Sequence, residues 1–365
     1  MKIRVLFVCL LILVAYIANA FANPIPLPLS SRSSTPQVKY GFSWSFENAD
    51  WYGLNSRDAY VKLLDEVKFD WVRLSIFWDR HVKDGELNLG EIEFAIREAE
   101  KRDIKVIVVV GAKTPYHPEY HLPDNIKNQI KFGDTITVDH PIADDLLEID
   151  RIVVQELSKY PNISYWQVEN EPFLANIDNL KIGPDLLGAE VDVVRGNDLG
   201  HRPIILNHVG PAAFDRQYKK LFEIMKPGDI LGVNSYLKTQ GVNLFSVSVF
   251  GREIRVPWPK WLFWPVQSWV FLSPDYTRLR SEAAEKGLDL WVLEMQADPY
   301  VRSISEAQRK DYFFDTGDIS RGNDYLEASG VDSIGFWGAA FWLYRERIGD
   351  SSWINTISDI TSSRQ

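Results

Sequence analysis

The chain has 365 residues, a formal net charge of −10 and a single cysteine. Proteins that bind nucleic acid or an anionic membrane surface carry basic faces, so this charge argues against both kinds of partner. Aromatic residues make up 13% of the sequence, including 13 Trp. This richness leaves two interpretations open, a large aromatic core or a binding surface that stacks on the flat apolar faces of sugars.

The N-terminus is typical of a targeting segment. Two basic residues precede an apolar run over residues 5–17, and cleavage sites of the small-x-small type follow it. Because the run is shorter than the roughly 20 residues that span a bilayer, we predict a signal peptide over residues 1–22 and a secreted or periplasmic protein. The alternative is an uncleaved membrane anchor. The only cysteine, Cys9, lies in this segment, so we expect no disulfides in the mature protein.

Residues 23–37 are rich in Pro and Ser and predict a short linker. From residue 38 onward, apolar runs typical of strands alternate with segments of helical periodicity. The predicted strands cover residues 39–46, 69–78, 104–110, 163–168, 203–206, 230–233, 288–293 and 333–337. The predicted helices cover residues 57–67, 89–102, 142–159, 186–194, 213–225, 276–286 and, as one or two helices, 305–328.

Eight strands alternating with helices are the pattern of a (β/α)8 barrel. The rival α/β fold, a doubly wound open sheet, is expected to have a glycine-rich phosphate turn after its first strand. Residues 43–46 stand there and contain no glycine. We therefore predict an α/β fold of the (β/α)8, or TIM barrel, type, as a single domain over residues 38–360.

The sixth strand is followed by an aromatic-rich insertion over residues 237–273, which contains four Trp and three Pro. Apolar surface on this scale needs a partner. Our first interpretation is a lid or wall that contacts further sugar units or a hydrophobic aglycone. A self-packed or dimer-contact loop and interfacial contact with a membrane are the alternatives.

Two predicted strands end in glutamate. The fourth leads into Asn170-Glu171-Pro172, and the seventh ends at Glu294. The carboxyl ends of barrel strands form the face that carries active sites, and strands four and seven would stand across that face from each other. Two carboxylates placed this way are the equipment for glycoside hydrolysis, in which one protonates the leaving oxygen and the other attacks the anomeric carbon or activates water. The alternative is two unrelated salt bridges.

The motif Asn170-Glu171-Pro172, with a glutamate at the end of strand seven, resembles the retaining (β/α)8 glycoside hydrolases of the clan that includes the family-five cellulases and mannanases. The resemblance covers nearly all of residues 39–345. It implies that Glu171 is the general acid/base, that Glu294 is the nucleophile and that Asn170 binds the 2-hydroxyl of the sugar being cleaved. The implied reaction is cleavage of a β-glycosidic bond in an oligo- or polysaccharide or glycoconjugate by double displacement.

The resemblance also assigns residues around the two carboxylates. Arg73 on strand two resembles the arginine that supports the nucleophile, and Tyr236 after strand six resembles the tyrosine that donates to it. The aromatic run over residues 336–342 corresponds to the indole floor under the sugar. Its two candidates are Trp337 and Trp342, and the length of strand eight favours Trp337.

The ends of strands three, five and six add candidates and differences. Asn207 and His208 follow strand five and are candidates for lining the substrate site, although His208 is equally well interpreted as a structural hydrogen-bonding group. The clan's family-five members have His-x-Tyr at strand six, where this chain has residues 234–236 as Asn-Ser-Tyr, and a histidine after strand three, where residues 111–113 are Gly-Ala-Lys. Glu169 is expected on the same strand face as Glu171, as a buried partner of a basic group.

No metal or other cofactor is expected. His117 and His121 have the i, i+4 spacing of zinc ligands, but that spacing needs a helix and Pro118 interrupts it. We interpret this segment as a loop lining the substrate site. The alternatives to a retaining glycosidase are a carbohydrate-binding barrel without catalysis, a transglycosylase that uses the same residues, and a metal-dependent barrel hydrolase.

Overall fold

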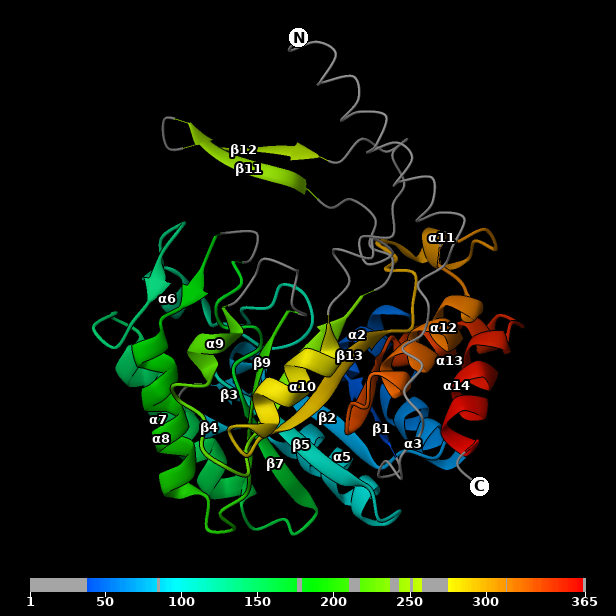
Figure 1. Ribbon diagram of the computed structural model, residues 1–365, viewed down its shortest axis with the longest axis horizontal. Coiled ribbons are helices and arrows are strands. Elements are labelled where there is room, and N and C mark those ends of the chain that lie inside the picture. The colour runs from blue at the N-terminus through cyan, green and yellow to red at the C-terminus, as the bar shows by residue number, and fades with distance from the viewer. Residues whose placement is uncertain are drawn as a thin grey trace.

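Eight parallel strands close into a barrel in this computed structural model (Figure 1). The structure describes residues 38–83, 86–175, 179–209, 217–236, 243–249, 252–257, 275–312 and 314–363. The barrel strands are β1 (Lys39–Trp44), β2 (Trp71–Ser75), β5 (Lys105–Val110), β7 (Ile163–Val168), β9 (Ile204–His208), β10 (Ile230–Ser235), β13 (Asp289–Gln296) and β14 (Ser333–Trp337). Each corresponds to one predicted strand, so the predicted (β/α)8 barrel is confirmed.

Helices surround the barrel, and most of them correspond to the predicted ones. Those that match are α3 (Ser56–Glu66), α5 (Gly90–Glu100), α7 (Ala143–Leu157), α8 (Pro184–Asn197) and α10 (Tyr276–Ala284). The segment predicted over residues 305–328 contains α11 (Ile304–Ala307) and α12 (Thr316–Ala328). The helix predicted over residues 213–225 is described only as α9 (Tyr218–Leu221), because residues 210–216 lie outside the described part of the chain.

Further elements were not predicted from the sequence. The additional helices are α2 (Phe46–Trp51), α4 (Trp78–His81), α6 (Asp124–Lys127), α13 (Ala339–Arg347) and α14 (Ser352–Ser362). The short strands are β3 (Val82–Lys83), β4 (Glu86–Leu87), β6 (Thr135–Ile136) and β8 (Lys181–Ile182). Helices α13 and α14 follow the last barrel strand and pack on each other, which closes the chain over the outside of the barrel.

Amphipathic spacing explains why the outer helices form and how they dock. In α3 the Asn55 side chain caps the first turn by accepting the main-chain N–H of Asp58, and the residues at positions 59, 60, 63 and 64 are buried. These four positions repeat every three to four residues, so they form one apolar face of a helix. That face packs against the barrel and leaves the polar residues in solvent.

The lower interior of the barrel is filled by two indoles. The rings of Trp71 on β2 and Trp291 on β13 stack with their centroids 5.8 Å apart. A Cβ atom on Gly41 would lie 2.0 Å from the Trp71 ring, and one on Gly335 would lie 2.4 Å from it. Glycine on β1 and β14 therefore makes the space for a tryptophan core, which seals the barrel beneath its carboxyl end.

A β-bulge in β13 decides which way its glutamate points. Val233 pairs with Val292, but the next residue, Asn234, pairs with Glu294, so β13 contains one extra residue at Leu293. The pairing of β13 with β14 shifts at the same place. Without the bulge, Leu293 and Glu294 would point to opposite faces, because side chains alternate along a strand. With it, Leu293 packs in the barrel interior and Glu294 also turns inward.

Backbone geometry after β7 separates two glutamates that the sequence places on one face. The strand ends at Val168, and Glu169 and Glu171 both have positive φ angles, +60° and +48°. These left-handed conformations end the alternation of side chains, so Glu169 points outward and Glu171 points over the barrel mouth. The expectation that both side chains share one face is therefore wrong.

The segment between β10 and α10 contains β11 (Asn243–Val249) and β12 (Arg252–Pro257), an antiparallel pair. The other residues of the predicted aromatic-rich insertion lie outside the described part of the chain, so the prediction of a lid stays untested. The predicted signal peptide and linker, residues 1–37, also lie outside it. Among the described helices, none is long and apolar enough to cross a membrane.

Candidate active site

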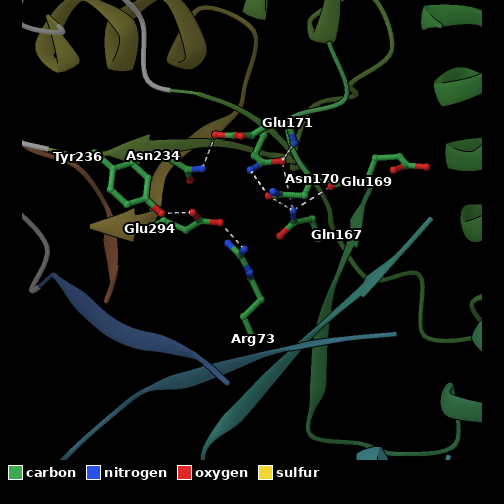
Figure 2. Close-up of polar contacts among 9 residues, drawn as sticks. Arg73, Gln167, Glu169, Asn170, Glu171, Asn234, Tyr236 and Glu294 are labelled. Atoms are coloured by element: carbon green, nitrogen blue, oxygen red, sulfur yellow. Dashed lines mark hydrogen bonds and ion pairs between the residues drawn. The ribbon is translucent and has the colours of Figure 1, made fainter. Parts of the chain in front are cut away.

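The Glu294 carboxylate is held by two groups that reach it from different parts of the barrel (Figure 2). One terminal nitrogen of Arg73 on β2 donates to Glu294 Oε1 at 2.5 Å, and the hydroxyl of Tyr236, just after β10, donates to Oε2. Arg73 is almost fully buried, and Glu294 is 5% exposed. A guanidinium and a phenol at this position both favour the ionised form of the carboxyl group.

Glu171 is held differently, by a neutral partner. The side-chain amide of Asn234 on β10 donates to Glu171 Oε1 at 2.7 Å. Burial is the main cause that raises the pKa of Glu171 to about 7, with a further contribution from the Glu294 charge, while Lys113 and the Asn234 hydrogen bond act in the opposite direction. Near neutral pH this carboxyl group can therefore both give and take a proton.

Asn170 is fixed by a network of amides next to Glu171 (Figure 2). Asn207 Nδ2 on β9 donates to Asn170 Oδ1 at 2.8 Å, and Asn207 Oδ1 accepts the main-chain N–H of Glu171 at 2.8 Å. Gln167 Nε2 also donates to Asn207 Oδ1, at 3.2 Å. Asn207 was predicted to line the substrate site, but it is fully buried and orients the Asn170-Glu171 segment instead.

Only one of the two candidate indoles lies at the barrel mouth. Trp337 ends β14, and the Tyr116 ring lies against it with the centroids 4.4 Å apart. Trp342 lies on α13, is fully buried and donates its indole N–H to Ala297 O at 2.7 Å. Its assignment as part of the sugar floor is therefore wrong, because the helix that begins at Ala339 carries it into the core.

Three acidic side chains lie together behind the mouth. Glu169 contacts Glu190 on α8, which also contacts Asp150 on α7, and all three are buried. Burial raises the pKa of Glu169 to about 7 and raises the pKa values of Glu190 and Asp150 well above their ordinary range. Among the described residues no basic side chain forms an ion pair with Glu169, contrary to expectation, although the charge of Lys113 acts to lower its pKa. Its two oxygens accept main-chain N–H groups of Ala112 and Lys113.

The predicted histidines have structural surroundings. His208 is buried at the end of β9. The His121 ring stacks on Phe77 with centroids 3.9 Å apart, and it lies 3.9 Å from a carboxylate oxygen of Asp79. Within the residues that the structure describes, no group of three or more His, Cys, Asp or Glu side chains is arranged to hold a metal ion.

Asn234 and Lys113 were not predicted as site residues, and in the sequence they stand out only as differences from the clan's pattern. In the structure both contact the residues around Glu171, Asn234 through its amide and Lys113 through its ammonium group. Their positions at strand ends are visible in the sequence, so the signal was present. Their partners depend on the tertiary structure.

Residues 33–200 match the sequence profile of the cellulase family described as glycosyl hydrolase family 5. This is just under half of the chain, and it includes the Asn170-Glu171-Pro172 motif but ends before Glu294. No curated protein matches the chain in sequence.

Several solved structures share the fold. An endo-1,4-β-mannanase from Rhizomucor miehei has a TM-score of 0.54 at 12% identity, over 92% of this chain and 96% of that chain. A trimodular endoglucanase of the GH5_4 subfamily has a TM-score of 0.56 at 14% identity, over 89% of this chain and 60% of that chain. A β-galactosidase from Rahnella sp. R3 has a TM-score of 0.58 at 9% identity, over 93% of this chain and 57% of that chain.

At these identities the structural likeness shows the fold alone. The chain spans about three fifths of the length of the β-galactosidases that it matches. The likeness to the family rests on the profile match, which covers the motif that ends β7, and on the closed barrel that presents this motif at its carboxyl end. Residues 33–200 are therefore similar to the family-five cellulases, and the rest of the chain completes a (β/α)8 barrel.

Proposed function

We propose that this glycoside hydrolase cleaves β-glycosidic bonds of an oligo- or polysaccharide or glycoconjugate with retention of configuration. In this proposal Glu294 is the nucleophile and Glu171 is the general acid/base. The observation that carries it is the difference between their surroundings. Glu294 lies against a guanidinium and a phenol, whereas Glu171 has an amide partner and a pKa raised by burial to about 7. Such a difference separates an ionised nucleophile from a protonated acid.

The first step forms a covalent glycosyl-enzyme. A carboxylate oxygen of Glu294 attacks the anomeric carbon while the bond to the leaving oxygen breaks, and Glu171 transfers its proton to that oxygen. Glu294 becomes an ester and loses its charge. Because that charge contributes to the raised pKa of Glu171, the loss favours ionisation of Glu171.

The second step reverses the roles. The Glu171 carboxylate takes a proton from water, the water oxygen bonds to the anomeric carbon, and the ester bond to Glu294 breaks. Arg73 and Tyr236 then hold the returning negative charge on Glu294, since both already donate to its oxygens. We assign the sugar platform to Trp337, and the 2-hydroxyl contact to the amide nitrogen of Asn170, whose oxygen is held by Asn207.

The test is covalent trapping with a panel of 2-fluoro β-glycosides, followed by peptide mass analysis. One sugar of the panel is expected to label Glu294. Hydrolysis of aryl β-glycosides should be lost in Glu294→Gln. It should also fall in Glu171→Ala, and azide should restore part of it. NMR then shows whether the configuration of the products is retained or inverted. Persistent hydrolysis with no label on Glu294 for any sugar would contradict the retaining assignment.

The N-terminal segment and the aromatic-rich insertion supply two further proposals. We propose that residues 1–22 direct export, which N-terminal sequencing of secreted protein tests.

We propose that residues 237–273 contact extended or lipid-linked substrates, because the segment concentrates Trp and Pro between β10 and α10. Deleting them should impair turnover of such substrates and spare a small aryl glycoside. Unchanged activity on both kinds of substrate would contradict the proposal that this segment contacts the substrate.

A further inference from the structure

Lys113 follows β5. The family-five members of the clan usually have a histidine after this strand. The Lys113 side chain is fully buried, with no part of it in contact with solvent. Nζ donates to the main-chain carbonyls of Glu171 and Leu174, each at 2.9 Å, and lies 3.5 Å from Glu119 Oε2. The ammonium group thus makes two hydrogen bonds to main-chain carbonyls and one longer ion-pair contact.

The main chain of Lys113 contacts the same segment. Its N–H donates to Glu169 Oε2 at 2.6 Å, and its carbonyl accepts the N–H of Asn170 at 2.7 Å. One residue therefore makes four hydrogen bonds to residues 169–174, the stretch that contains the acid/base. The exposed Lys105 at the other end of β5 makes no such contact.

This stretch needs to be held. Glu169 and Glu171 have left-handed backbone conformations, at φ +60° and +48°. Such conformations are unfavourable for residues with a Cβ atom and persist only where the surroundings fix them. The main-chain carbonyl of Glu171 accepts a hydrogen bond from Lys113 Nζ, and its side chain accepts one from Asn234, so Lys113 holds the backbone of the residue whose carboxyl group Asn234 holds.

We propose that Lys113 is a positioning residue for proton transfer: by holding the Glu171 and Leu174 carbonyls from within, it fixes the direction in which the Glu171 carboxyl group meets the leaving oxygen. Its side chain is fully buried and donates to main-chain oxygens, so the role we assign is positioning and not contact with substrate. The inference rests on the proposed function, because it assumes that Glu171 is the acid/base.

The experiment compares leaving groups. A 2,4-dinitrophenyl glycoside departs without protonation, whereas a phenyl glycoside needs the acid. Lys113→Met is expected to lower kcat/KM on the phenyl glycoside by about 10²-fold, the low end of what general acid catalysis contributes, and to change the dinitrophenyl value only a few-fold. Lys105→Met is the matched control and should change neither value. The ratio of the two values is measured in one preparation, so it does not depend on the fraction of folded protein.

Three outcomes are distinguishable. An equal loss on both substrates in Lys113→Met, with a selective loss in Glu171→Gln, overturns the inference and leaves the proposed function intact. An equal loss in Glu171→Gln contradicts the proposed function itself. If Lys113→Met yields too little soluble protein, Lys113→Gln, which keeps an amide donor on a shorter side chain, decides by the same ratio: a selective loss smaller than that of Glu171→Gln supports the inference, and no selectivity overturns it.

Discussion

The side-chain amide of Asn234 donates a hydrogen bond of 2.7 Å to Glu171 Oε1. Asn234 also lies opposite Glu294 in the pairing of β10 with β13. The neutral residue Asn234 thus lies next to Glu294 in the sheet and binds Glu171 through its side chain. In the clan's family-five pattern a histidine, which can carry a positive charge, stands at this position.

Replacing the side-chain amide of Asn234 should shift the pH profile of activity to higher pH. The Asn234 hydrogen bond lowers the pKa of Glu171 because it stabilises the carboxylate, so Asn234→Ala should raise that pKa. The alkaline limb of the kcat/KM profile should then shift to higher pH, with a lower maximum. Asn234→Asp, which places a second carboxylate beside Glu171, should shift the limb further in the same direction. A shift to lower pH in either variant would refute this account.

The wild-type enzyme should lose activity above pH of about 7. Burial first, and then the Glu294 charge, raises the pKa of Glu171 to about 7, and the acid must be protonated in the free enzyme. Since the Glu294 charge raises this pKa, Glu294→Gln should lower it. A titration of ¹³C-labelled glutamate side chains by NMR measures both proteins directly. An unchanged Glu171 titration in Glu294→Gln would show that the two groups do not interact.

Arg73 should matter both for its charge and for the position of its hydrogen-bond donor beside Glu294. Arg73→Met leaves the buried Glu294 carboxylate without its cation, so kcat/KM should fall by about 10²–10³-fold, as for the loss of one preorganised donor. Arg73→Lys keeps the charge but places a compact, more strongly hydrated ammonium group where one guanidinium nitrogen donates to Glu294, so an intermediate loss in kcat/KM is expected. Equal activity in Arg73→Lys and the wild type would show that charge suffices.

Substitution of Trp337 should mainly affect activity, whereas substitution of Trp342 should mainly affect stability. Trp342→Ala removes a fully buried indole and should lower the free energy of unfolding by about 3–5 kcal/mol. Trp337→Ala should change that free energy much less but should raise KM and lower kcat on a glycoside substrate, because the indole lies at the barrel mouth. Denaturant unfolding and steady-state kinetics on the same two variants check this prediction.

The buried carboxyl group of Glu169 and its neighbours should make the protein less stable at alkaline pH. Burial raises the pKa of Glu169 to about 7 and also raises that of Glu190, so the folded state binds protons that the unfolded chain releases. This contribution is complete below the unfolded pKa near 4.3 and is lost as pH rises through about 7. The melting temperature should be several degrees higher near pH 5.5 than near pH 8.

A matched pair of variants isolates that effect. Glu190→Gln replaces one buried titrating group with an amide and should flatten the dependence of melting temperature on pH. Glu285→Gln, at an exposed position after α10, should leave it unchanged. The same steep dependence in Glu190→Gln as in the wild type would assign the effect to other groups.

The sequence by itself determined the barrel and the strand ends at which two glutamates stand. Strand and helix periodicity, repeated in chain order, is local information, and a strand that ends in Asn170-Glu171-Pro172 or in Glu294 is visible without any partner. In a closed parallel barrel all such strand ends meet at one rim. Chain order alone therefore brings the two glutamates to the same face.

Only the tertiary structure decided where those side chains point. Two-residue alternation fails where a strand gains a residue, as at Leu293, and where the backbone is left-handed, as at Glu169 and Glu171. Both features are fixed by neighbouring strands and by contacts such as those of Lys113, which join residues more than fifty positions apart. The burial of Trp342 was decided in the same way, because the helix that carries it packs into a core that the sequence does not display.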